Sequence, residues 1–101
     1  MDFVHYVGCF FAGAFLLNAV PHFVKGVCGD KFPTPFSKPP GKGLSSAPVN
    51  TVWALANLLV GLVLFHRGRV MSGIGEMLVF AAGFAVLAVW TSSHFQHKDS
   101  E

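Results

Sequence analysis

The sequence predicts an all-α integral membrane protein with three transmembrane helices, arranged as a single membrane domain over residues 1–101. Its composition is the first observation: 52% of the residues are hydrophobic and 12% are charged, against roughly a quarter charged in soluble domains. The second is the order of the chain, in which three long apolar segments alternate with polar ones. Eleven phenylalanines with few charges also exclude a disordered chain.

The first apolar segment, residues 3–24, contains no Lys, Arg, Asp or Glu. As a helix it would be about 33 Å long, enough to cross a hydrocarbon core of about 30 Å. Pro21 removes a backbone N–H and crowds the carbonyl group of Leu17, so we predict a kinked first helix. No Lys or Arg precedes the segment and no small-x-small cleavage site follows it, so we expect a retained helix and not a signal peptide.

Residues 25–48 differ in kind, because they hold four lysines and five of the six prolines. Proline prevents a regular helix, and unpaired backbone groups cannot face lipid, so this segment is predicted to be a loop in water or among the headgroups. Phe32 and Phe36 lie among the lysines. This mixture suits anionic lipid headgroups or a partner protein, with a simple connector as the alternative of equal weight.

Two further spans follow, at residues 49–65 and 71–90, joined by a polar turn at residues 66–70. A hydroxyl group and a proline before residue 49 are typical of a helix start. The short turn predicts a helical hairpin of the second and third spans. Residues 91–101 are predicted to be a polar tail.

Three spans place the loop and the tail on one side of the membrane, the loop side, and the N-terminus and the short turn on the other, the turn side. The loop side carries five lysines and the turn side two arginines. The positive-inside rule therefore predicts that the loop and the C-terminus are cytoplasmic, in a bacterial inner membrane or another cellular membrane.

Glu76 is the acidic residue within the predicted spans, about five residues or roughly 7 Å from the middle of the third. Intramembrane carboxylates are candidates for binding a proton, a cation or a substrate. The structural alternative is an interaction through water with Arg69, which precedes Glu76 by seven residues and would share its helix face. The two hypotheses have even weight.

A second candidate site consists of amides and a histidine. Asn18 and His22 lie four residues apart on one helix face, and Asn50, Asn57 and Gly61 form a stripe on the second span that should face protein. A polar line from Asn18 and His22 to Asn50 and Asn57 is expected either to bind a small polar ligand or headgroup or, more commonly, to join helices by hydrogen bonds.

No metal or cofactor is expected. The five histidines lie near the two membrane surfaces, and no close Cys/His spacing of a zinc site is present. Haem would need facing imidazoles, which His22 and His94 alone could supply, so we regard it as improbable. The lysines do not form one basic face, so nucleic acid is not expected as a partner.

These observations predict a non-enzymatic accessory or regulatory subunit of a membrane complex, since no nucleophile and base pair is evident. Three short helices bury little surface, so we expect a homo-oligomer or a place in a larger membrane complex. The alternative is a small oligomeric, proton-coupled carrier or channel that uses Glu76 with the Asn/His path of Asn18, His22 and Asn57.

Overall fold

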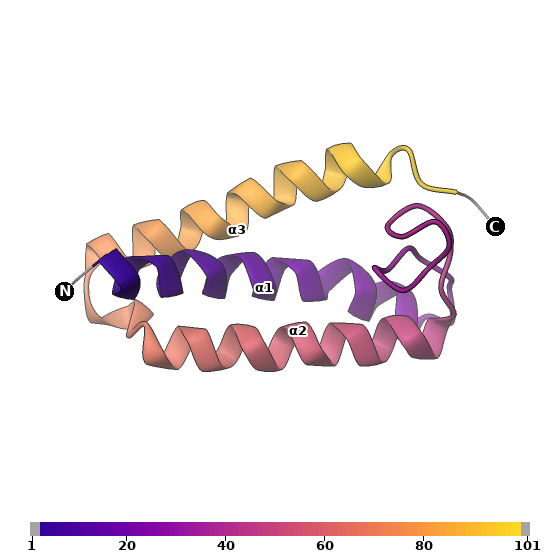
Figure 1. The fold of residues 1–101 in the computed structure, drawn as a ribbon. Coiled ribbons are helices and arrows are strands. Elements are labelled where there is room, and N and C mark those ends of the chain that lie inside the picture. The colour runs from indigo at the N-terminus through magenta and orange to yellow at the C-terminus, as the bar shows by residue number, and fades with distance from the viewer. Residues whose placement is uncertain (1–2, 100–101) are drawn as a thin grey trace.

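Three long helices and one short helical turn make up the computed structural model, which describes residues 3–99 (Figure 1). They are α1 (Phe3–Val27), α2 (Ala47–Arg67), the 3-10 helix η1 (Val70–Ser72) and α3 (Ile74–Phe95). Each long helix is long and apolar enough to cross a membrane. At 1.5 Å per residue they extend over about 38, 32 and 33 Å, so the prediction of an all-helical chain with three helices long enough to span a membrane is confirmed.

The helix ends differ from the predicted spans for local reasons. Helix α2 begins at Ala47 because the side chain of Ser46 accepts a hydrogen bond from the backbone N–H of Val49 (3.4 Å). Helix α3 begins at Ile74 and not at residue 71, because η1 and the extended Gly73 precede it. Pro21 lies inside α1, which continues to Val27, and the predicted kink stays a prediction.

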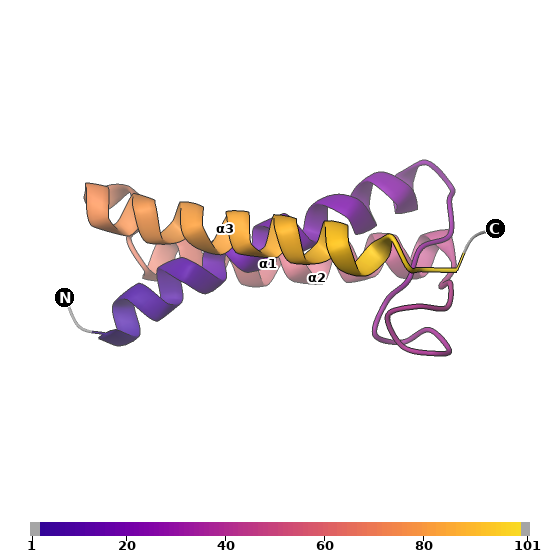
Figure 2. The same cartoon turned by 90° about the horizontal axis from the view of Figure 1, so that it is seen from above.

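Helix α1 lies between α2 and α3 (Figure 1). The inter-helix contacts are those of α1 with α2 and of α1 with α3, whereas α2 and α3 scarcely touch within residues 3–99. The second and third helices are consecutive and antiparallel, as in the predicted hairpin, but each packs against α1 more than against the other. Viewed from above, α1 crosses obliquely between its neighbours, so that its C-terminal end and the loop lie on opposite sides of α3 (Figure 2).

Small residues explain why α1 occupies the centre. A Cβ atom on Gly13 of α1 would collide with the backbone of Phe80 in α3, and one on Gly83 of α3 would collide with the carbonyl oxygen of Phe10. On the other side of α1, a Cβ atom on Gly61 of α2 would overlap the side chain of Leu16. These glycines allow close backbone approach, which is the main source of helix association in lipid.

The segment between α1 and α2 is irregular, as predicted, and packs over one end of the bundle. Phe32 and Ser45 form an antiparallel bridge with backbone hydrogen bonds of 3.2 and 3.0 Å. The tail joins the same end, because the backbone N–H of Asp99 donates to the carbonyl oxygen of Lys42 (3.0 Å). Loop and tail therefore share one end of the bundle, here called the loop end, and the opposite end is the turn end (Figure 1).

Candidate functional site

The four site residues predicted from the sequence fall at two ends of the bundle. Asn18, His22 and Asn57 lie together towards the loop end, where they line one cavity. Glu76 lies at the turn end beside His5. His5 precedes Asn18 by thirteen residues of α1, a rise of about 20 Å, and the close crossing of α1 and α3 lies between. The structure therefore brings three of the four residues together and leaves Glu76 apart.

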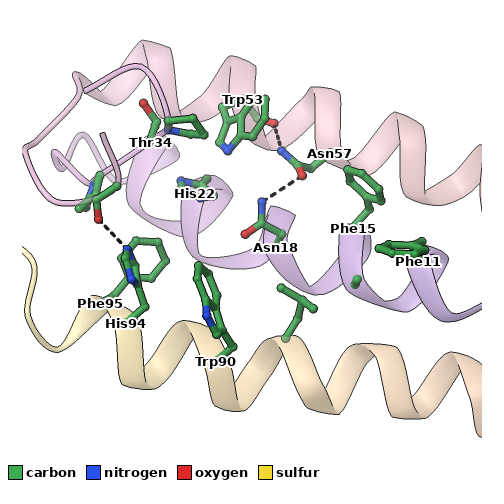
Figure 3. A pocket seen from close by; sticks show the side chains of 15 residues that line it. Phe11, Phe15, Asn18, His22, Thr34, Trp53, Asn57, Trp90, His94 and Phe95 are labelled. Carbon is green, nitrogen blue, oxygen red and sulfur yellow. Dashed lines mark hydrogen bonds between the residues drawn. The ribbon is translucent and has the colours of Figure 1, made fainter. Parts of the chain in front are cut away.

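The cavity, drawn from close by in Figure 3, has a volume of about 330 Å³ and lies towards the end of the bundle where α2 and α3 diverge (Figure 1). All three long helices and the loop contribute to its wall. It is partly open, since the side chains of Phe11 and Trp90 at its edge are 46% and 54% exposed. The lining is mostly aromatic and apolar, with a few polar side chains; it comprises Phe11, Ala14, Phe15, Asn18, His22, Pro33, Thr34, Pro35, Gly41, Trp53, Asn57, Leu87, Trp90, His94 and Phe95.

A chain of amide hydrogen bonds crosses from α2 to α1 beside the cavity. The side-chain amide of Asn57 donates to the carbonyl oxygen of Trp53, one helical turn earlier (2.8 Å). Its Oδ1 accepts a hydrogen bond from the Nδ2 group of Asn18 (3.0 Å). Asn57 is 2% exposed, so the prediction that this face of the second span is turned towards protein is confirmed.

His22 is held by Asn50, which belongs to the predicted stripe of Asn50, Asn57 and Gly61 on α2. Asn50 Oδ1 lies 2.8 Å from His22 Nδ1, and the Asn50 amide donates to the carbonyl oxygen of Phe32 (2.8 Å) and to those of Ser45 and Ser46 (3.2 and 3.1 Å). Asn50 is fully buried and His22 is 2% exposed. One side chain thus fixes the imidazole, the start of α2 and the fold of the loop.

Aromatic rings complete the cavity. Trp90 and His94 stack with their rings 4.8 Å apart and nearly parallel (7°), and His94 Nε2 lies 2.9 Å from the carbonyl oxygen of Gly41 in the loop. Phe36 meets Trp53 edge to face at 5.2 Å. The last turns of α3 contact the loop through His94 and also through Phe95, whose ring lies 4.7 Å from that of Phe32, so the rings also close the loop end of the cavity.

Trp53 carries an unusual polar atom. Within residues 3–99, its Nε1 is the one buried side-chain nitrogen or oxygen without a hydrogen-bond partner. Figure 3 shows this nitrogen on the side of the ring that faces His22 and Asn18. A buried donor without a partner costs about 1–3 kcal/mol.

Glu76 contacts His5 directly, and the shared helix face on which its interaction with Arg69 was predicted is interrupted. Glu76 Oε2 lies 3.2 Å from His5 Nε2, and among residues 3–99 no ion pair joins Glu76 to Arg69. The prediction assumed one continuous helix, whereas Arg69 has a left-handed backbone (φ 50°) and a 3-10 turn follows it. Glu76 is also shallower than predicted, about eight residues or 12 Å from the middle of α3, in the first turn where the helix dipole favours a carboxylate.

The charged side chains lie outside the cavity. None of its lining residues is Asp, Glu, Lys or Arg. Lys38 and Lys42 are exposed on the loop, and Lys98 lies 6.0 Å from the ring of Phe32. Within the part of the chain that the structure describes, no three His, Cys, Asp or Glu side chains come close enough to hold a metal ion. The cavity therefore offers hydrogen bonds and ring faces but no formal charge.

Sequence reasoning missed Trp53, Trp90 and the loop as parts of this site. The two tryptophans fit the pattern of interfacial anchors, which gives no sign that they enclose a cavity. Their position near the lysine-rich loop was the available signal. Comparison with protein-family models, with curated proteins and with solved structures found no match.

Proposed function

We propose that this protein binds a small, uncharged, membrane-soluble molecule in the cavity at the loop end. The observation that carries the proposal is the cavity itself: about 330 Å³, walled by aromatic rings, bordered by Asn18, His22 and Asn57, and free of charged side chains. Ligand sites combine these features, with a mostly apolar wall and a few polar groups that fix orientation. The divergence of α2 and α3 gives such a molecule a lateral path from the bilayer.

The protein acts, in this proposal, as a non-enzymatic accessory or regulatory subunit of a homo-oligomer or a larger membrane complex. Large apolar side chains are exposed on all three helices, among them Leu59, Leu78 and Val89 at 63–68%. Lipid or other subunits would cover them. Lysines of the loop and the tail are suited to anionic headgroups, and their number supports a cytoplasmic position for the loop and the C-terminus.

The carrier alternative is less well supported within a single chain. It requires a polar path from Asn18 and His22 to Glu76, and the crossing at Gly13 and Gly83 brings two backbones together in between. A carrier would have to form that path between copies of the chain. Loss of proton flux from reconstituted vesicles on Glu76→Gln substitution, with assembly intact, would favour the carrier over the accessory subunit.

A cavity-filling substitution tests the proposed binding function. Ala14 is 6% exposed and lines the cavity, so Ala14→Phe should occupy part of the space. Ala85→Phe adds the same ring on the exposed surface of α3 and serves as the control. Protein purified in nanodiscs is extracted with organic solvent, and the extracts are compared by mass spectrometry.

The proposal predicts that a small molecule is retained by the native protein and by Ala85→Phe but is lost from Ala14→Phe. Identical extracts from all three proteins would contradict the proposal. The variant Leu87→Trp places a larger side chain in the α3 wall and so also reduces the space in the cavity. It provides an independent test if Ala14→Phe does not fold.

A further inference from the structure

The direction of the hydrogen bonds around the cavity restricts what it can bind. The carbonyl oxygen of Trp53 can only accept, so the group of Asn57 that faces it must be the NH₂ donor. The Oδ1 atom of Asn57 therefore faces Asn18, and the NH₂ group of Asn18 must donate the hydrogen bond to it. The remaining atom, Asn18 Oδ1, is an acceptor without a hydrogen bond in residues 3–99, and it points into the cavity (Figure 3).

The same reasoning applies to His22. The amide nitrogen of Asn50 faces three backbone carbonyl groups and must donate to them, which leaves Asn50 Oδ1 as an acceptor. His22 Nδ1 must then carry the proton that it donates to Asn50. In the neutral imidazole Nε2 is consequently an acceptor. Within the described chain it has no hydrogen bond of its own.

Three residues that line the cavity thus carry unpaired groups: Asn18 and His22 each have an acceptor, and Trp53 has a buried donor, Nε1. A hydroxyl group can pair with the donor and with one of the two acceptors, because it donates one hydrogen bond and accepts another. A ketone, ether or ester oxygen can pair with Trp53 but leaves both acceptors unpaired. A protonated amine would donate as well, but no carboxylate lines the cavity to compensate its charge.

We infer that the cavity selects an uncharged alcohol or phenol, whose hydroxyl group lies between Asn18, His22 and Trp53 while its hydrocarbon part packs against the aromatic wall. This inference rests on the proposed binding function and names the ligand class of the same site. It distinguishes reduced, hydroxyl-bearing ring compounds from their oxidised or alkylated forms, because only the former can donate. The hydrogen bonds of Asn57 to Asn18 and of Asn50 to His22 determine this selectivity.

Two probes of nearly equal size and hydrophobicity test the inference. Para-hexylphenol carries a hydroxyl group, and para-hexylanisole carries a methyl ether at the same position. Each is titrated into the protein in nanodiscs, and binding is followed by the fluorescence of the two tryptophans, both of which line the cavity. Because the bound ether would cover both acceptors without donating to either, the phenol should bind about tenfold more tightly than the ether.

The variant Asn18→Leu removes one acceptor and should reduce the preference for the phenol severalfold, whereas Ala14→Phe should reduce the binding of both probes. Equal affinities of the two probes for the native protein, together with loss of both in Ala14→Phe, would overturn the inference and leave the binding function standing. Absence of saturable binding of either probe would overturn both. The comparison of probes on the native protein remains decisive if Asn18→Leu does not fold.

Discussion

Replacement of Asn50 by alanine tests whether one side chain organises the loop end of the bundle. Asn50 is fully buried and binds His22 and three backbone carbonyl groups. The carbonyl groups have second partners: the oxygen of Phe32, for example, also accepts from the backbone N–H of Ser45 (3.0 Å). His22 Nδ1 has no such replacement. Asn50→Ala therefore leaves one buried donor unpaired, which costs about 1–3 kcal/mol.

Asn50→Ala also removes the hydrogen bonds that the Asn50 amide donates to the loop. When their loss is included, we expect this substitution to lower the free energy of unfolding by about 2–3 kcal/mol. Asn57→Ala is the matched control, because Asn57 is equally buried on the same face of α2. Asn57→Ala loses one inter-helix hydrogen bond, the one to Asn18, whose side chain borders the cavity. This substitution should therefore lower the free energy of unfolding by about 0.6 kcal/mol, a value typical of such bonds in membranes.

Steric trapping in bicelles measures both free energies of unfolding under the same conditions. Hydrogen exchange of the backbone amides in the loop gives a second readout, since the loss of protection should be confined to Asn50→Ala. The reasoning is refuted if the two variants lose equal stability, or if the loop of Asn50→Ala remains as protected as that of the native protein.

Three further changes probe other parts of the structure. Gly83→Ala should separate α1 from α3 and destabilise the bundle by about 1–3 kcal/mol. The control, Gly8→Ala, adds its methyl group in open space and should be neutral or slightly stabilising. Equal effects of the two substitutions in a thermal unfolding assay would contradict the close approach of α1 and α3. A double-mutant cycle of His5→Gln and Glu76→Gln on stability should show coupling of at least about 0.5 kcal/mol, and additive losses would argue against their contact. Reporter fusions after Lys42 and after the last residue should both report the cytoplasm, and opposite sides would contradict three spans.

The number and positions of the helices could be predicted from the sequence because a span of a bilayer needs a long segment without charge. The stripe of Asn50, Asn57 and Gly61 could also be predicted to face protein, since polar side chains avoid lipid, and all three are buried. Both predictions depend on a single physical requirement that acts along one helix.

The order of the helices could not be predicted in this way. Small residues occur in all three spans, and the sequence does not reveal which glycine meets which backbone. The contact of Glu76 with His5 was missed because the left-handed Arg69 and the turn after it break the helical periodicity. Nor does spacing reveal the cavity, which arises from the crossing of α1 and from a loop held by tertiary hydrogen bonds to Asn50.

The central claim, that the cavity at the loop end binds a small uncharged hydroxyl compound, is tested most directly by NMR of the indole N–H groups. The chain has two tryptophans, so the spectrum of the protein in nanodiscs should contain two such signals, with Trp53→Phe identifying one of them. On titration with para-hexylphenol, the account predicts a saturable shift of the Trp53 signal to lower field, as its N–H gains a hydrogen bond, and no such shift in Ala14→Phe. A Trp53 signal that does not respond to the phenol, or that responds equally in the filled variant, would contradict the account.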